Sequence, residues 1–180
     1  QNGFRRERAG DLAHAGHVGA GVILVNSVQL AGHVTVGEKA IISGTSAAHQ
    51  FVKIGKYAFV GGCSRISQDV PPFVKAVGNP LKLYGLNSVG LARNNFPEEV
   101  VHELKRAYRL FFRSELNVTQ AKQRAATDLK PFPEVQDLLQ FVEQSGRGVV
   151  DCARACASAA SVPAVLACIM SAACATCRDR

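Results

Sequence analysis

Aliphatic residues or alanine recur at every sixth position through the first third of the chain. The series runs without an insertion over Leu12, Val18, Leu24, Leu30, Val36, Ile42, Ala48, Ile54, Val60 and Ile66. A small or β-branched residue stands four positions after each member, and glycine directly follows several of them. A period of six fits neither the turn of an α-helix, which is roughly 3.6 residues, nor a simple strand alternation.

Repeats of six residues are typical of a parallel β-helix, in which three hexads complete one triangular coil. The aliphatic residue of each hexad then points into a narrow interior, and glycine permits the geometry of the corner. We therefore expect a mainly β protein with a parallel β-helix of hexapeptide repeats over residues 12–71. An ordinary β-sandwich of short strands is the alternative.

The repeat ends where Pro71 and Pro72 remove two amide donors from the ladder of hydrogen bonds. We expect a connecting loop over residues 72–96. Apolar residues return at helical spacing after this loop, which predicts a small helical C-terminal domain over residues 97–148.

Three helices are expected in this domain, and each has a plausible start. The first begins near Pro97, because proline suits the first turn of a helix. The second begins after Asn117, which can act as an N-cap, and the third begins at Pro133.

The two ends of the chain differ from the part between them. Residues 1–11 form an atypical N-terminal segment without the apolar run of a signal peptide. Residues 149–180 form an alanine- and cysteine-rich tail, which we expect to lie outside the fold. Cys174 and Cys177 have the spacing of a redox or metal pair, but one such pair is a weak signal.

An uncharged run in this tail, residues 155–176, has the length of a membrane span. Because it is rich in alanine, serine and cysteine and is interrupted by Pro163, we expect no stable membrane span. Cys63 is the lone cysteine before residue 150, which is typical of a reduced, cytoplasmic domain.

The formal net charge of +7 is a mild excess for 180 residues. It suits an anionic substrate or an acidic partner protein. No basic stripe interleaved with aromatic residues is present, so the sequence does not predict nucleic-acid binding.

Three histidines, His14, His33 and His49, stand 19 and 16 residues apart, close to the length of one coil. They can therefore lie on one face of successive coils. Three interpretations are open: solvated turn residues, a metal site, or a general base with supporting donors in a cleft between subunits.

Short motifs within and after the repeat occur in a characteristic order. The runs LAGHV, HQF, VGGCS and QDVPP are followed by YGLNSVGLARNNF and by a helical tail that ends in FVEQSGRG. Over about residues 12–148, this chain resembles the acyl-ACP–UDP-N-acetylglucosamine O-acyltransferase family of lipid A biosynthesis. The resemblance implies a left-handed β-helix, a cytoplasmic homotrimer and active sites between neighbouring subunits, with neither a cofactor nor a metal.

The family transfers a 3-hydroxyacyl chain from acyl carrier protein to the 3-hydroxyl of UDP-N-acetylglucosamine. By resemblance, His14 is the general base and the backbone amide of Gly32 is the oxyanion donor. Gly62 matches the position that sets the depth of the acyl pocket. The positions that match the family's substrate-binding residues are His33, His49, Gln50, Asn87 and Arg93.

The chain also departs from the family pattern. Ala15 follows His14 where the family has an aspartate, and Val89 stands where the family has a glutamate. We further expect the family's earlier coils to be missing before Leu12. Two alternatives therefore stay open: a catalytically impaired fragment that keeps only the fold and the trimer contacts, and the related UDP-3-O-acylglucosamine N-acyltransferase.

Overall fold

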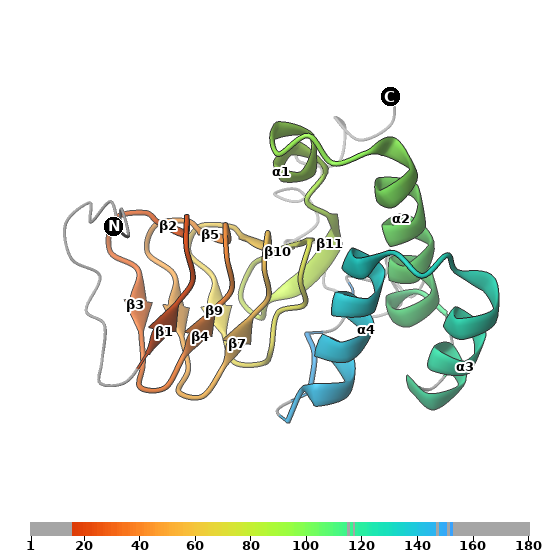
Figure 1. Ribbon diagram of the computed structural model, residues 1–180. Helices are drawn as coiled ribbons and strands as arrows, with labels where there is room; N and C mark the ends of the chain where they lie inside the picture. The colour runs from red at the N-terminus through yellow and green to blue at the C-terminus, as the bar shows by residue number, and fades with distance from the viewer. Residues whose placement is uncertain (1–15, 115, 117, 147, 151, 153–180) are drawn as a thin grey trace, which may run out of the picture.

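The computed structural model of the chain describes residues 16–114, 116, 118–146, 148–150 and 152. Two-residue strands follow one another at six-residue intervals through its first half (Figure 1). They are β1 (His17–Val18), β2 (Ile23–Leu24), β3 (Gln29–Leu30), β4 (Thr35–Val36), β5 (Ile41–Ile42), β6 (Ala47–Ala48), β7 (Lys53–Ile54), β8 (Phe59–Val60) and β9 (Arg65–Ile66).

Each strand pairs in parallel with the third strand after it. Thr35 lies beside His17 and Lys53 lies beside Thr35, so one coil takes three hexads. The coils form three sheets: a first sheet of β1-β4-β7, a second that contains β2-β5-β8, and a third of β3-β6-β9. The fold is a left-handed parallel β-helix, which confirms the predicted fold class.

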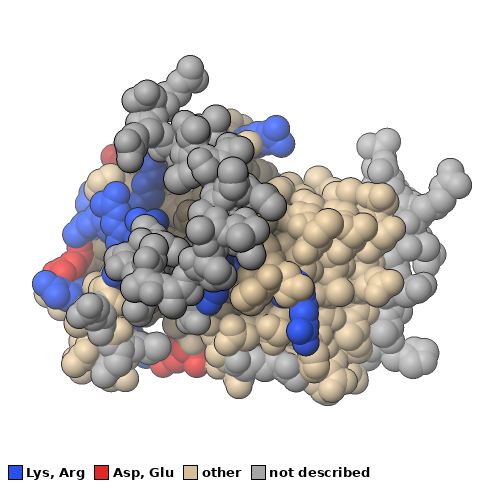
Figure 2. Space-filling view, turned by 180° about the vertical axis from the view of Figure 1, so that it is seen from behind, with Lys and Arg blue, Asp and Glu red and all other residues tan. Residues whose placement is uncertain are grey.

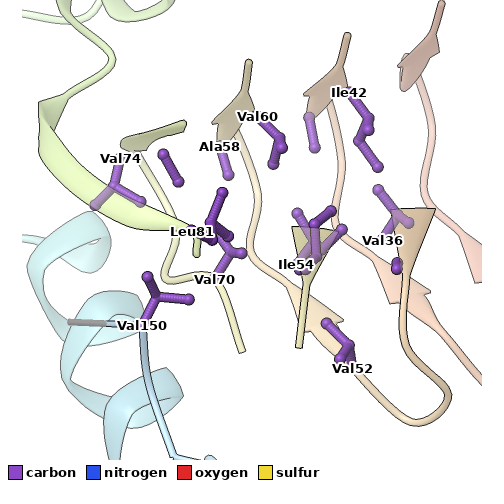
Figure 3. Close-up of a cluster of buried hydrophobic side chains, with 14 of the residues drawn as sticks. Val36, Ile42, Val52, Ile54, Ala58, Val60, Val70, Val74, Leu81 and Val150 are labelled. Atoms are coloured by element: carbon purple, nitrogen blue, oxygen red, sulfur yellow. The ribbon is translucent and has the colours of Figure 1, made fainter. Parts of the chain in front are cut away.

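The hydrophobic periodicity of the sequence is the periodicity of the core. In a typical strand such as β4 the first residue is exposed and the second is buried. From residue 28 to residue 70, the repeat aliphatics and the small residues four positions later are all at most 5% exposed. Figure 3 shows several of these side chains, including Ile42, Ile54 and Val60, converging in the interior. Burial of this apolar surface is the main stabilising term of the coils.

Glycine is required where successive coils approach most closely. A Cβ atom added to Gly37 would lie 2.5 Å from the backbone nitrogen of Lys56 on the next coil. Any side chain at Gly37 would therefore push two backbones apart.

The segment expected to be a connecting loop, residues 72–96, instead contains two strands and a helix. Strand β10 (Val74–Val77) joins the second sheet beside β8, and β11 (Lys82–Leu86) runs antiparallel to β10. Helix α1 (Ser88–Arg93) follows. The expectation of a loop is wrong because the prolines end the hexads but not the sheet, and alternate residues of β10 are buried in the same core.

Three longer helices lie at the end of the β-helix; the first and third of them enclose a second core, and the second packs against the first (Figure 1). They are α2 (Glu98–Phe112), α3 (Val118–Asp128) and α4 (Pro133–Gln144). The fully buried residues of this second core include Phe73, Leu91, Leu104 and Leu138. The expected N-cap Asn117 lies outside the described residues.

The beginning of the alanine- and cysteine-rich tail belongs to the fold, contrary to the expectation for residues 149–180. Val149 forms a parallel bridge with Asp69, and Val150 is 1% exposed within the main core. These residues are held because the Val150 side chain packs in the main core and its amide donates to the carbonyl oxygen of Asp69 at 3.0 Å. Residues 1–15, 151 and 153–180, with the Cys174–Cys177 pair, lie outside the described part.

The helices in the described ranges are all too short or too polar to cross a membrane.

Candidate functional site

The predicted site residues that the structure describes lie at or near all three corners of the triangular coil. Gly62 lies at the corner between the second and third sheets, and Asn87 and Arg93 lie near the corner between the first and second sheets. The other predicted residues that the structure describes share the corner between the third and first sheets, which we call the histidine corner: Gly32, His33, His49 and Gln50. Phe51, which the sequence did not predict as a site residue, lies at the same corner.

The histidine corner carries a stacked pair of rings from successive coils. The rings of His33 and Phe51 are parallel within 3°, with centroids 4.9 Å apart. The backbone amide of Phe51 donates to the carbonyl oxygen of Gly32 at 3.1 Å. Phe51 is 52% exposed, so an aromatic surface faces outward where a water-soluble domain would normally place polar side chains.

His49 is fixed to the same corner by its main chain. Its amide donates to the carbonyl oxygen of Ile66 at 2.8 Å, and its ring Nδ1 lies 3.2 Å from the carbonyl oxygen of Gln50. A proton on Nδ1 makes this contact a hydrogen bond. The corner thus combines imidazole rings with backbone groups of defined orientation.

Gly32 has the features of a backbone donor. Within the described part of the chain its amide has no hydrogen-bond acceptor, whereas its carbonyl accepts from Phe51. The expected general base, His14, lies outside the described residues. The described corner therefore contains the expected oxyanion donor and ligand-binding residues, and the role of His14 stays a prediction.

A cleft of about 480 Å³ lies between α1 and the outward face of the second sheet, and we call it the cationic cleft. Lys39, Lys75 and Arg93 line it, and none of the described residues that line it is an aspartate or a glutamate. Its floor is apolar and consists of the outward side chains of β2, β5 and β8: Ile23, Ile41 and Phe59. Such a cleft suits an anion that also has an apolar part.

Asn87 ties α1 to the β-helix. Its Oδ1 accepts from the Gly90 amide at 3.0 Å, and its Nδ2 donates to the carbonyl oxygen of Tyr57 at 3.0 Å. Asn87 is therefore the N-cap of α1 as well as a residue of the cleft. These two bonds fix the helix that carries Arg93.

Two lysines and an asparagine of the cleft were not predicted from the sequence. Lys39 donates from Nζ to Oδ1 of Asn94 at 3.0 Å, and Lys75 lies beside Phe59 in the second sheet. The signal for Lys39 was its place in the repeat, because it stands one coil before Tyr57 at the same corner. A lysine at a turn otherwise has the pattern of any solvated residue.

Gly62 is exposed and stands apart from both of these regions. A Cβ atom added there would lie 3.3 Å from the carbonyl oxygen of Gly44 on the preceding coil. A small side chain would therefore fit with a slight shift and would project outward.

No group of three or more histidine, cysteine or acidic side chains is arranged to hold a metal ion in the part of the chain that the structure describes.

Known proteins resemble this chain in both sequence and structure. Residues 69–150 match the family model described as UDP N-acetylglucosamine O-acyltransferase, domain 2. The acyl-[acyl-carrier-protein]–UDP-N-acetylglucosamine O-acyltransferase of Aliivibrio salmonicida is 41% identical over 139 residues, which are 77% of this chain and 53% of that protein.

Two solved structures are similar over most of the described part. The UDP-N-acetylglucosamine acyltransferase of Bacteroides fragilis aligns with a TM-score of 0.74 and 32% identity, covering 75% of this chain and 53% of that one. The UDP-N-acetylglucosamine O-acyltransferase of Moraxella catarrhalis aligns with a TM-score of 0.69 and 39% identity, covering 72% and 51%. The chain thus spans about half the length of the relatives it matches.

Proposed function

The chain belongs to the UDP-N-acetylglucosamine O-acyltransferase family, and from this premise we propose the activity of the whole protein. It transfers a 3-hydroxyacyl chain from acyl carrier protein to the 3-hydroxyl of UDP-N-acetylglucosamine, the first step of lipid A biosynthesis. The sugar hydroxyl attacks the thioester carbonyl, an ester forms, and the carrier protein leaves with a free thiol.

The histidine corner and the cationic cleft lie apart in one chain, and this separation supports an assembly of several copies. His33 precedes β4 and Lys39 follows it, so the two regions lie at opposite edges of the first sheet in one chain. One small substrate can contact both only when the corner of one copy faces the cleft of another. We therefore propose a cytoplasmic homotrimer with sites shared between neighbouring subunits.

The outward face of the second sheet supports this assembly. Ile23 is 53% exposed and continues into Ile41 and Phe59 along one ladder. The corresponding positions of the first sheet are His17, Thr35 and Lys53, which are polar. An apolar ladder on an otherwise polar solenoid suits contact with a second copy and with the acyl chain between copies.

The proposed chemistry requires neither a cofactor nor a metal. His14 removes the proton of the attacking hydroxyl, which an imidazole can do near neutral pH. The amide of Gly32 donates to the oxyanion of the tetrahedral intermediate. His33, His49 and Gln50 orient the sugar nucleotide.

Binding of the nucleotide and of the acyl chain completes the proposed assignment. Asn87 and Arg93 act on the phosphate side, where the planar guanidinium can bind phosphate through two hydrogen bonds. Gly62 leaves room for the end of the acyl chain.

An acidic carrier protein fits the charge of the helical region. Lys105 and Arg109 of α2 and its C-cap residue Arg113 are exposed at four-residue intervals, which places them on the same side of the helix. Figure 2 shows Lys and Arg side chains gathered on the helical side of the molecule and few on the adjoining β-helix surface. We propose that the carrier protein docks on this side of the helical region.

The decisive experiment follows acyl transfer to UDP-N-acetylglucosamine in a protein that carries this chain at the full length of its relatives. His14→Ala is expected to lower turnover on the order of 100-fold or more, because the attacking hydroxyl loses its base. His17→Ala is the matched control, since His17 is an exposed histidine on the outward face of β1. Equal turnover of the His14→Ala protein and its parent would overturn the assignment of the base.

A further inference from the structure

The cationic cleft holds more positive charge than the assigned residues explain. Lys39, Lys75 and Arg93 line it together, and none of the three has a carboxylate partner among the described residues. Unpaired cations that share a cleft repel one another, and a bound anion relieves that repulsion. The cleft therefore suits an anion that carries more than one negative charge, because Arg93 alone would neutralise only one.

Lys39 is held in a defined position within this cleft. Its backbone has a φ of 51° at the turn, and its amide donates to the carbonyl oxygen of Ala20 at 2.9 Å. Its Nζ donates to Oδ1 of Asn94 at 3.0 Å and lies 5.5 Å from the centroid of the Tyr57 ring. Contacts of the backbone and of the end of the side chain reduce the entropy that a free lysine would lose on binding a ligand.

Asn94 has the geometry of a positioning residue. Its Nδ2 donates to the carbonyl oxygen of Gly90 at 2.8 Å, so its Oδ1 is directed to the lysine. Asn94 is neutral, which leaves the full charge of Lys39 and two of its three N–H donors for a ligand. Because Asn94 directly follows Arg93 in the chain, the ammonium group lies close to the segment that carries the guanidinium.

We propose that Lys39, positioned by Asn94, is a further phosphate-binding residue that recognises the diphosphate of the sugar nucleotide together with Arg93. The inference rests on the proposed function, since it names a further contact to the same nucleotide. Arg93 binds one phosphate through its planar fork, and Lys39 binds the other phosphate as a point charge. The site thereby distinguishes a nucleoside diphosphate from a monophosphate.

The test measures binding of UDP, UMP and uridine to the full-length protein by isothermal titration calorimetry. Lys39→Met keeps most of the side-chain length and removes the charge, and it is expected to weaken UDP binding about tenfold. The same substitution should weaken the binding of UMP less and the binding of uridine little. The ratio of the affinity for UDP to the affinity for UMP should therefore fall. Lys39→Arg is expected to restore most of the preference for UDP.

Asn94→Ala is expected to weaken UDP binding about threefold and to have no added effect on the Lys39→Met background. Lys130→Met serves as the control, because it removes an exposed lysine outside the cleft. Circular dichroism of each variant checks that the fold is retained.

The outcomes separate this inference from the proposed function. A Lys39→Met protein that keeps the parent's preference for UDP over UMP would overturn the role of Lys39, while Arg93→Ala still loses affinity and the acyl-transfer assay still succeeds. A parent protein that binds neither UDP nor UMP would overturn both proposals.

Discussion

The β-helix and the helical region bury apolar surface in two different ways. In the β-helix each residue of the core lies above its equivalent from the previous coil, and the backbone ladder repeats with it. In the helical region the core is assembled from segments far apart in the sequence, such as Phe73, Leu104 and Leu138. The first arrangement tolerates no change in backbone spacing, whereas the second depends on individual side-chain contacts.

This difference explains where the functional residues lie. The coils fix their corners by backbone hydrogen bonds, such as the one from Tyr57 to Glu38 at 2.9 Å, so side chains at the corners are not needed for stability. His33, Lys39 and Phe51 occupy such corners with positive φ. The helical region instead contributes α1, with Arg93, and a charged outer surface. The β-helix supplies rigid positions, among them those of Lys39 and Lys75, and the helical region adds Arg93 to the same cleft.

The largest loss of stability is expected from a substitution that places a side chain between two coils. Gly37→Val would bring a Cβ atom to 2.5 Å from the backbone nitrogen of Lys56, and neither backbone can move without breaking the ladder. We expect a loss of about 3 kcal/mol or more, seen as little soluble folded protein.

Gly146→Val is the matched control, because a Cβ atom there would meet nothing within 4 Å. Soluble expression and thermal melting compare the two variants. Equal melting temperatures would show that the coils are not spaced as closely as the structure indicates.

A smaller effect, limited to one region, is expected from a cavity in the second core. Leu104→Ala removes a side chain that is fully buried between α2 and its neighbours, at a cost of about 2–5 kcal/mol. Because the β-helix has its own core, the helical circular dichroism signal should be lost at a lower temperature than the β signal. Lys105→Ala, at the exposed neighbouring position, should melt like the parent, and a single transition for Leu104→Ala would contradict the division into two cores.

Most of the fold could be predicted from the sequence because the core residues of a solenoid recur at a constant spacing along the chain. Val36 and Ile54 are inward at the same phase of the repeat, so their roles are readable without any tertiary information. β10 could not be predicted in the same way, because it leaves the period of six and is recognisable only when paired with β8.

The candidate site was harder to predict from the sequence than the fold, because the tertiary structure brings its residues together. Lys39 and Asn94 are 55 positions apart and meet only because α1 folds back onto the corner. The resemblance supplied Arg93 and Asn87, but charge and spacing alone would have supplied neither. His14 lies outside the described residues and stays a prediction.

The smallest change in stability is expected from a substitution in a charged contact that joins the helices. Glu103 is 5% exposed, accepts two hydrogen bonds from Arg106, at 2.9 and 3.1 Å, and accepts one from the amide of Lys130 at 3.3 Å. Arg106 in turn donates to the carbonyl oxygen of Asp128 at 2.8 Å. These contacts connect α2 to the end of α3 and to the link that precedes α4.

This contact makes the stability of the helical region depend on pH. Burial raises the pKa of the Glu103 carboxyl, but the hydrogen bonds from Arg106 and Lys130 and the charge of Arg106 outweigh it and hold the pKa below its ordinary value of 4.5. A carboxylate with a lowered pKa in the folded state stabilises the fold above its unfolded pKa, and this contribution is lost as the pH falls through the folded value.

Glu103→Gln should therefore lower the melting temperature at pH 7 by about 2–4 °C, corresponding to about 1 kcal/mol. The difference from the parent should begin to shrink below about pH 4.5, where the carboxyl of the unfolded chain takes up a proton, and should disappear once the pH has fallen through the lower pKa of the folded state. Glu99→Gln, at an exposed position of the same helix, should change the melting temperature at pH 7 less than Glu103→Gln does. A constant difference between Glu103→Gln and the parent from pH 7 to pH 3 would mean that the ionised carboxylate does not join the helices, and that packing alone holds the second region together.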